Sequence, residues 1–305
     1  MHRESVKILL VLCSIVFVQH FSFAQTSLNK PNLGEPSKIA PFYFGPNAFP
    51  VPDMLDGKVS GELLVELGTD YYVGFAKDWT ADVFAKLSVP LFTERARLTV
   101  WMPFVEFYGY TAERKRQCRL SDSIPSKGHD SGDVYVATEI YLLKEKTLCP
   151  ALAIRAALKA ASSDKGFYNA RNYDCPGYFF DATLAKSIKF KNNFFEELRF
   201  VGSTGFLCWQ TDNGRQNDAV MYGLRVKLQM KYLTIQKTWS GYVGWEKDGD
   251  RPMTLKTNVA GRIGNFEPFF SYQYGLKDYP FHQFRLGLTY KIDVLNRAKK
   301  KNKGQ

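Results

Sequence analysis

The chain has 305 residues, 45% of them hydrophobic and 15% aromatic, which is enough for one large domain. Its mean hydropathy is negative and, beyond residue 24, no stretch approaches the ~18 consecutive apolar residues of a spanning helix, which excludes a helical membrane protein. The net charge is +11, but residues 1–24 hold two bases and one acid, which leaves +10, and five bases of the tail supply half of that. We therefore expect a solvated basic tail over residues 293–305, on the periplasmic side, and no nucleic-acid partner.

The first 24 residues have the parts of a secretory signal peptide. Arg3 and Lys7 give the positive end, Ile8 to Val18 the apolar run, and Ser22-Phe23-Ala24 a small-x-small cleavage site. The apolar run is too short for a spanning helix. We therefore expect an exported chain, either a secreted soluble protein or an outer-membrane barrel.

Residues 25–57 contain six prolines and show no sustained alternation of polar and apolar side chains. Proline has no backbone N–H to donate, so this segment is not an interior strand. We expect a proline-rich periplasmic leader, and the alternative is a plug that folds into the lumen of the domain that follows.

From residue 58 to residue 292, apolar side chains alternate with polar ones in segment after segment. Successive strand side chains point to opposite faces, so this pattern predicts strands with one apolar face and one polar face. The pattern is clearest from 220 to 245, where two such segments form a hairpin. Twelve strands are predicted, with 10 or 14 as alternatives, at residues 59–71, 80–89, 95–108, 133–143, 151–161, 178–189, 195–209, 220–230, 233–245, 253–263, 266–274 and 283–292.

The predicted strands and their connections favour a barrel in a membrane. Most strands have the roughly 9–11 residues that a spanning strand needs, and short turns alternate with longer polar loops after the first hairpin. An even count lets the last strand pair antiparallel with the first, so that no sheet edge faces lipid. We therefore predict an all-β fold, a closed antiparallel up-and-down transmembrane β-barrel. Aromatic residues at outward strand ends are expected to form its interface girdles: Tyr108, Tyr178, Tyr222, Trp245, Phe266, Tyr274 and Tyr290.

The alternative fold is an exported soluble β-sandwich or lipocalin-like barrel, with its apolar face inward. The polar strand faces argue against it, because they carry many Arg, Lys, Glu and Asp residues. A soluble sandwich cannot place these charges on one strand face and also bury two sheets.

The middle of the chain resembles a known family. Ser131-Gly-Asp-Val-Tyr-Val-Ala-Thr-Glu-Ile-Tyr-Leu-Leu-Lys-Glu145, with Pro150 to Lys159 and Ser162-Ser163, is similar to outer-membrane barrels of the phenol-degradation (meta-pathway) transporter type. Residues 40–54 resemble the corresponding segment of barrel proteins from the Bacteroidota. The resemblance implies an outer-membrane barrel that transports solutes, and it carries no catalytic residues to transfer.

The charged residues on the predicted inner face are the candidate functional set. Opposite charges across a narrow lumen would orient polar solutes and filter ions, whereas in the alternative they pair with one another and fill the lumen. We expect Lys291 to approach Glu62 and Arg285 to approach Glu66. Inward bases outnumber acids, which favours anionic solutes in a conducting barrel. The predicted lumen-lining, solute-binding residues are Glu62, Glu66, Asp82, Arg95, Arg97, Glu139, Arg155, Lys159, Arg199, Arg225, Lys227, Lys256, Arg262, Arg285 and Lys291.

A remote alternative is an outer-membrane lipid hydrolase. His129 and Ser131 form a His-x-Ser pair, as in outer-membrane phospholipases and lipid A deacylases, and Glu139 could orient the histidine. The asparagine that follows the serine in phospholipases is replaced by Gly132. Glu139 lies eight residues from Ser131, about 26 Å in an extended strand. We therefore predict that the protein is not an enzyme.

Four cysteines lie in the predicted barrel region. In the predicted topology Cys118, Cys175 and Cys208 are on the outer side, so Cys175–Cys208 or Cys118–Cys175 could be bridged, while Cys149 would stay a thiol. The cysteine spacings fit no zinc site, and no cofactor is expected.

The predicted function is that of an outer-membrane channel or transport protein for small solutes in a Gram-negative envelope. The alternative is a structural or surface-recognition barrel with a plugged lumen. The expected partners are outer-membrane lipid, small solutes and lipopolysaccharide, whose phosphates would meet the basic loop 109–132. The sequence leaves the solute, the openness of the lumen and the oligomeric state undetermined.

Overall fold

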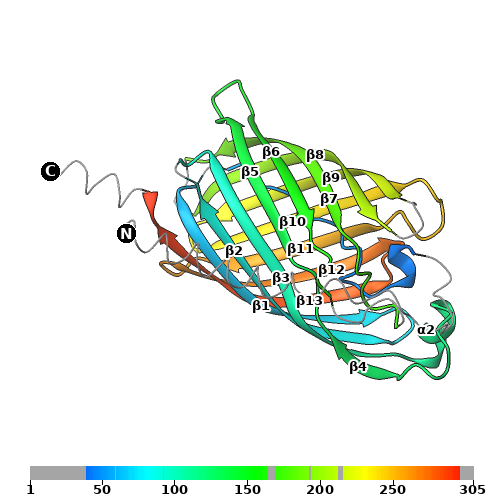
Figure 1. The fold of residues 1–305 in the computed structure, drawn as a ribbon. Helices are drawn as coiled ribbons and strands as arrows, with labels where there is room; N and C mark the ends of the chain where they lie inside the picture. Colours follow the sequence, from blue (N-terminus) through cyan, green and yellow to red (C-terminus); the bar gives the residue numbers. More distant parts are fainter. Residues whose placement is uncertain are drawn as a thin grey trace, which may run out of the picture.

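The computed structural model describes residues 39–58, 60–91, 93–163, 169–191, 194–211 and 216–295. In these residues, twelve antiparallel strands form a closed barrel, and one extra strand, β4, extends its rim (Figure 1). The barrel closes where β1 pairs with β13 from Glu62↔Asp293 to Gly74↔Phe281. The predicted all-β, closed, up-and-down barrel of twelve strands is confirmed.

Each predicted strand is present, with its ends displaced by only a few residues. The barrel strands are β1 Glu62–Gly74, β2 Trp79–Pro90, β3 Ala96–Gly109, β5 Tyr135–Leu143, β6 Ala151–Lys159, β7 Gly177–Lys189, β8 Phe195–Gln210, β9 Gln216–Met230, β10 Leu233–Gly244, β11 Met253–Gly261, β12 Phe266–Lys277 and β13 Phe281–Asp293. The remaining elements are the 3-10 helix η1 Pro41–Tyr43, the helix α2 Ala112–Gln117 and β4 Lys127–Asp130. The predicted signal peptide (1–24) lies outside the described residues, as do residues 25–38 and most of the tail.

The strands turn their apolar side chains outward and their charged side chains inward. Leu224 and Leu286 are 59% and 65% exposed on the outer face, whereas Asp70 and Arg199 are 3% and 2% exposed inside. This is the polarity of a barrel whose outer face meets lipid. No helix among the described residues is long and apolar enough to cross a membrane.

One strand departs from the predicted alternation. The pairing of β2 with β3 shifts register between Val83 and Phe84, where Val83 pairs with Val105 and Phe84 pairs with Pro103. Proline cannot donate to the ladder, and strands accommodate it at such bulges. Beyond the bulge the faces exchange, so Tyr108 is buried in the lumen rather than placed in the outer girdle as predicted.

The two ends of the barrel differ. The long connections, with α2 and β4, lie at one end, here called the loop side (Figure 1). The start of β1 and the end of β13 lie at the other end, here called the turn side, with the connections that follow β2, β5, β7, β9 and β11. The connections after β1 and β12 are equally short but lie on the loop side. The elements α2 and β4 fall in the predicted outer loop 109–132 and were not expected, because neither has a strand-length alternation.

The lumen is not empty. Residues 39–58, here called the lumenal segment, run inside the barrel from the loop side to the turn side. Phe44 and Phe49 of this segment are buried, in one cluster with Tyr173 and Trp209. The lumenal segment therefore belongs to the interior of the barrel, and its contacts define the candidate site.

Candidate functional site: the occupied lumen

On the loop side the lumenal segment is bound through its backbone. The N–H of Phe42 donates to Gly249 O (3.1 Å), and the N–H of Gly45 donates to Ala170 O (2.8 Å). Arg114 of α2 donates from Nη2 to Phe44 O at 3.0 Å. A side chain on residue 45 would place its Cβ 2.5 Å from Arg171 O, so only glycine fits this approach. The outer loops and the segment thus form one packed layer.

Arg114 also ties the segment to the hairpin loop between β1 and β2. Its Nε lies 3.6 Å from Asp78 Oδ2, and both side chains are buried. Burial raises the pKa of the Asp78 carboxyl, and the charges of Arg114 and Arg171 oppose that rise. The ion pair therefore offsets part of the cost of burying the carboxyl.

Near the loop-side ends of β2 and β3, an asparagine of the segment meets two wall acids. Asn47 Nδ2 donates to Asp82 Oδ2 (2.8 Å) and to Glu106 Oε2 (2.7 Å). Arg171 reaches the same Glu106 from the loop after β6, at 2.7 Å, and donates to Thr80 Oγ1 at 2.6 Å. These contacts join the segment, the wall and a loop in one buried polar cluster.

Two aspartates of the segment pair with wall lysines further toward the turn side. Asp53 Oδ1 lies 3.0 Å from Lys256 Nζ on β11, and Asp56 Oδ2 lies 2.8 Å from Lys227 Nζ on β9. Both bonds are charge-assisted, and the lysine side chains are only 15% and 18% exposed. The segment therefore brings its own carboxylates to the barrel wall.

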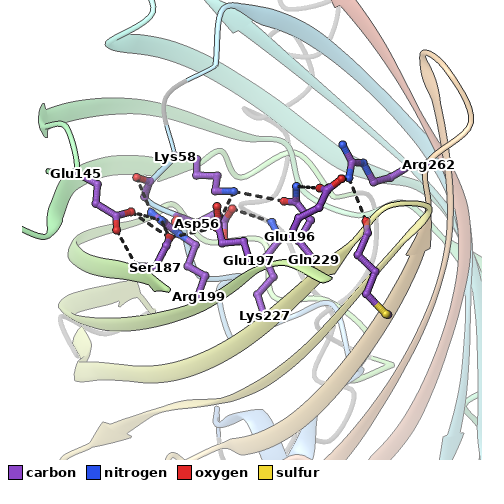
Figure 2. A network of polar contacts seen from close by, with 12 residues as sticks. Asp56, Lys58, Glu145, Ser187, Glu196, Glu197, Arg199, Lys227, Gln229 and Arg262 are labelled. Atoms are coloured by element: carbon purple, nitrogen blue, oxygen red, sulfur yellow. Dashed lines mark hydrogen bonds and ion pairs between the residues drawn. The ribbon is translucent and has the colours of Figure 1, made fainter. Parts of the chain in front are cut away.

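Arg199 fixes the turn-side end of the segment, as Figure 2 shows. Its Nε and Nη2 donate to the backbone carbonyls of Asp56 and Gly57, both at 3.0 Å. Its Nη1 donates to Glu145 Oε2 (2.7 Å) and to Ser187 Oγ (2.6 Å). One buried guanidinium thus joins the segment to the turn between β5 and β6.

The rest of this polar network surrounds the end of the segment. Lys58 Nζ lies 2.8 Å from Glu197 Oε1, and Gln229 donates to Glu196. Arg262 lies 2.6 Å from the same Glu196 (Figure 2). Burial opposes the lowering of the Glu145 pKa, but hydrogen bonds from Ser187 and Arg199 prevail and hold it below its ordinary value.

A cavity of about 170 Å³ remains beside the segment. Its wall combines aromatic and charged side chains from many strands. They include Phe84, Trp101, Lys86, Glu66, Lys256 and Arg285, and the segment contributes residues 46–47 and 50–55. This cavity therefore lies between the lumenal segment and the barrel wall.

The structure places the predicted lumen residues as follows. Most carry a polar partner on the wall: Glu62 with Ser60, Arg97 with Ser60 O, Glu139 with Thr99 and Tyr141, Arg155 with Asp181, and Lys159 with Asp133. Glu66 lies 3.9 Å from Lys86, and Arg225 donates to Thr238. Arg95 lies in the turn before β3 and is exposed, because β3 begins at Ala96.

The predicted pairs across the closing seam are wrong. Arg285 pairs with Asp70, through two bonds of 2.6 Å, and not with Glu66. Lys291 pairs with Glu267 on β12, and not with Glu62. The pairing of Arg285 with Asp70 follows from the register of β1 against β13, in which these two residues face each other.

The His-x-Ser pair forms no triad. His129 is exposed on β4, and its ring lies 6.3 Å from that of Phe107 on the neighbouring strand. Glu139 accepts hydrogen bonds from Thr99 and Tyr141. Among the described side chains, no hydrogen bond links the histidine to Ser131 or Glu139.

The cysteines and the bases of the outer loop are placed as follows. No disulfide joins Cys118, Cys149, Cys175 or Cys208. Of the bases in the outer loop, Arg114 and Lys115 are buried, whereas Arg116, Arg119 and Lys127 are exposed. In the described part of the chain no cluster of His, Cys, Asp or Glu could hold a metal ion.

Several residues of the site were missed by sequence reasoning. Glu106 follows the bulge at Pro103, and the predicted alternation of this strand would turn its side chain outward. A charged residue at an outward position was the sequence signal that the two faces exchange there. Arg171 and Arg114 lie in loops, where no periodicity marks them. Asn47, Asp53 and Asp56 lie in the proline-rich segment, whose sequence fits both a periplasmic leader and a lumenal plug.

No model of a known protein family matches the chain, and no curated protein is similar to it in sequence. An outer-membrane channel from Pseudomonas putida F1 has a similar structure, with a TM-score of 0.52, 9% identity, and alignment over 79% of this chain and 100% of that one. The chain has the fold of an outer-membrane β-barrel. The NanC and KdgM porins align with 75% of it and with 100% and 99% of their own chains, at TM-scores of 0.49 and 0.48 and identities of 10% and 8%.

At these identities the similarity establishes the fold alone. The resemblance of residues 131–163 to barrels of the phenol meta-pathway type therefore stays a prediction. The same holds for the link between residues 40–54 and barrel proteins of the Bacteroidota.

Proposed function

We propose that this protein is an outer-membrane channel for small solutes, closed by its own lumenal segment until that segment is displaced. The observation that carries the proposal is the way the segment is held. It enters no sheet, and it contacts the wall through hydrogen bonds, ion pairs and side-chain packing, all of which are reversible. In this proposal residues 39–58 act as the plug, the second of the two interpretations of the proline-rich segment.

The size of the cavity supports a gate rather than a permanent narrow pore. A cavity of about 170 Å³ is close to the roughly 150 Å³ that accepts a benzene-sized molecule in a protein interior. A larger solute would have to move the segment to pass. The charged and aromatic lining is suited to small polar or aromatic molecules that carry charge.

The proposed preference is for anions. The lumenal segment is faced by Arg225 and Lys227 of β9 and by Lys256 of β11, and the two lysines pair with its aspartates. The segment carries two acids, Asp53 and Asp56, and one base, Lys58, so its removal would leave the open lumen more positive than the closed one. Rings of basic side chains favour anions in pores.

The proposed location is the outer membrane of a Gram-negative bacterium, reached through a cleaved signal peptide. The exposed apolar outer face and the fold support this. Arg116 and Arg119 remain available at the loop side for lipopolysaccharide phosphates.

The test is conductance in planar bilayers of the full mature chain and of the double variant Phe44→Ala/Phe49→Ala. The two rings are buried with the lumenal segment in place, and each truncation costs about 3–5 kcal/mol of packing that the empty barrel does not need. We therefore expect rare openings of the parent and frequent openings of the variant. The matched control is Phe104→Ala, on the outer face, which should behave as the parent.

A closed parent and a closed, correctly folded double variant would contradict the channel. That result would instead favour the structural or surface-recognition barrel, for which the occupied lumen is the supporting observation. Cation preference, measured as a reversal potential in a salt gradient, would contradict the proposed preference for anions. It would not contradict closure of the channel by the lumenal segment.

A further inference from the structure

We propose that Asp53 and Asp56 occupy, in the closed channel, the places that the carboxylates of an anionic solute take on the barrel wall, so that the solute itself displaces the lumenal segment. This inference rests on the proposed gated channel and adds its substrate class, a small molecule with two or more carboxylates. It also adds the event that opens the gate.

The wall side of the site is a contiguous group of bases, here called the basic strip: Arg199, Arg225, Lys227 and Lys256. Strand register brings them together. Arg199 on β8 faces Lys227 on β9, and Arg225 and Lys256 both face Thr238 of the intervening strand β10. Arg225 and Lys227 are two residues apart and share the inner face.

The acids that neutralise the basic strip come largely from the lumenal segment. Lys227 pairs with Asp56, and Lys256 pairs with Asp53. Arg225 donates to the neutral Thr238, and the nearby acids whose charges act on it are these same aspartates. Arg199 gives two of its bonds to the carbonyls of residues 56 and 57, and its counter-charge is Glu145, an acid of the barrel itself.

Other bases in the lumen are neutralised differently. Arg155, Lys159, Arg285 and Lys291 each pair with an acid of the barrel itself: Asp181, Asp133, Asp70 and Glu267. These pairs stay intact whether or not the segment is present. Departure of the segment would therefore uncover positive charge at three members of the basic strip, Arg225, Lys227 and Lys256, while Arg199 keeps Glu145.

Uncovered bases in a partly desolvated wall are costly unless an anion replaces the lost carboxylates. Asp53 and Asp56 are three residues apart and reach two lysines on different strands, so the geometry favours a ligand with at least two carboxylates. A monocarboxylate would replace only one of the two ion pairs.

The cavity gives such a ligand its entry. Asp53 and Lys256 both line it, and the Asp53 side chain is 53% exposed. An entering carboxylate meets this pair first. Exchange at Lys256 would free one point of the segment, and exchange at Lys227 would follow.

The experiment records open probability in planar bilayers for the full mature chain, with citrate as the probe and chloride at equal ionic strength as the control. We expect millimolar citrate to raise the open probability of the parent about tenfold over chloride, which corresponds to replacing contacts worth about 1.4 kcal/mol. Chloride at equal ionic strength screens charges equally, so a difference between the anions reports binding.

The variant Asp53→Asn/Asp56→Asn lacks both carboxylates of the segment. Without citrate, its open probability should be about tenfold higher than that of the parent, which again corresponds to about 1.4 kcal/mol. Addition of citrate should change this open probability little. The variant Lys227→Gln/Lys256→Gln should lose the citrate response, because its wall lacks the binding groups. Glu267→Gln is the matched control, since its partner Lys291 belongs to the wall, and it should respond as the parent does. Circular dichroism confirms that each variant is a folded β-barrel.

The outcomes separate this inference from the proposed function. If the phenylalanine or aspartate variants conduct but citrate and chloride act alike on the parent, the inference is overturned and the gated channel stands. If the phenylalanine variant opens and the aspartate variant stays as closed as the parent, the inference is likewise overturned. If no folded variant conducts, the proposed function itself fails.

Discussion

Arg171 shows how single residues hold the lumen together. Its side chain is 1% exposed, and the guanidinium bonds to Glu106 and Thr80 on the wall. The same guanidinium lies over the rings of Tyr108 and Tyr110. Glu106 in turn accepts from Asn47 of the lumenal segment. A buried ion pair of this kind is strongly destabilising when only one partner is removed, because the other charge stays buried.

Arg171→Met is therefore expected to lower the free energy of unfolding by about 3–5 kcal/mol, since Glu106 loses its counter-charge. Urea unfolding of the protein in lipid vesicles measures the change. The double variant Arg171→Met/Glu106→Gln should regain part of the loss, because it leaves no unpaired charge. An unchanged unfolding midpoint for Arg171→Met would contradict the role given to this pair.

At the scale of elements, the turn between β5 and β6 and the lumenal segment are coupled through one arginine. Glu145 of that turn accepts from Arg199 and from the N–H and hydroxyl of Ser187. Lys186 lies 3.7 Å from the same carboxylate. A change in the charge of Glu145 therefore reaches the end of the segment.

For the proposed gated channel, the pH dependence of opening follows from the pKa of Glu145. Burial raises this pKa, but hydrogen bonds from Ser187 and Arg199 outweigh it, so the folded-state value lies below the ordinary 4.5. A carboxylate with a depressed pKa stabilises its contacts above the unfolded value and loses them as the pH falls through the folded one. Open probability should be flat from neutral pH to about 5 and rise only in more acidic solution than an ordinary glutamate requires.

The variant Glu145→Gln distinguishes the effect of the Glu145 charge from that of Asp56, whose backbone carbonyl contacts the same Arg199. The variant should open more often than the parent at neutral pH and should lose the Glu145 part of the acid response. If the parent opens between pH 7 and 5, or if the variant keeps the full acid response, a group other than Glu145 controls the release of the lumenal segment.

At the scale of the whole molecule, an apolar outer face surrounds a charged interior. Leu67, Leu224 and Leu286 are more than half exposed, while the inner face holds buried ion pairs such as Arg155–Asp181. This inverted polarity distinguishes the chain from a soluble barrel of the same strand number.

Leu286→Arg, on the outer face of β13, should lower the free energy of unfolding by about 2–4 kcal/mol if the residue lies near the bilayer midplane. Gln273→Arg is the control, since this residue lines the cavity and an arginine there stays in a polar lumen. Its effect should stay below about 1 kcal/mol. Equal costs in lipid vesicles would contradict the placement of lipid on the outer side.

Much of the fold followed from the sequence, because its signal is local. An alternation of period two, with charges in one phase, marked all twelve strands, and turn lengths marked the two ends of the barrel. The prediction went wrong where a local irregularity reversed the phase, as Pro103 does in β3 and hence at Tyr108. It also missed α2 and β4, which are too short to show a period.

The sequence by itself determined that the strands present one apolar and one charged face, since side-chain direction in a strand depends only on position. Only the tertiary structure decided which charges meet. The partner of Arg285 depends on the register at which β1 and β13 close the barrel, and that register is set by all twelve strands together. The path of residues 39–58 through the lumen depends on contacts with loops and strands distant in the chain, and no pattern within a proline-rich segment encodes those contacts.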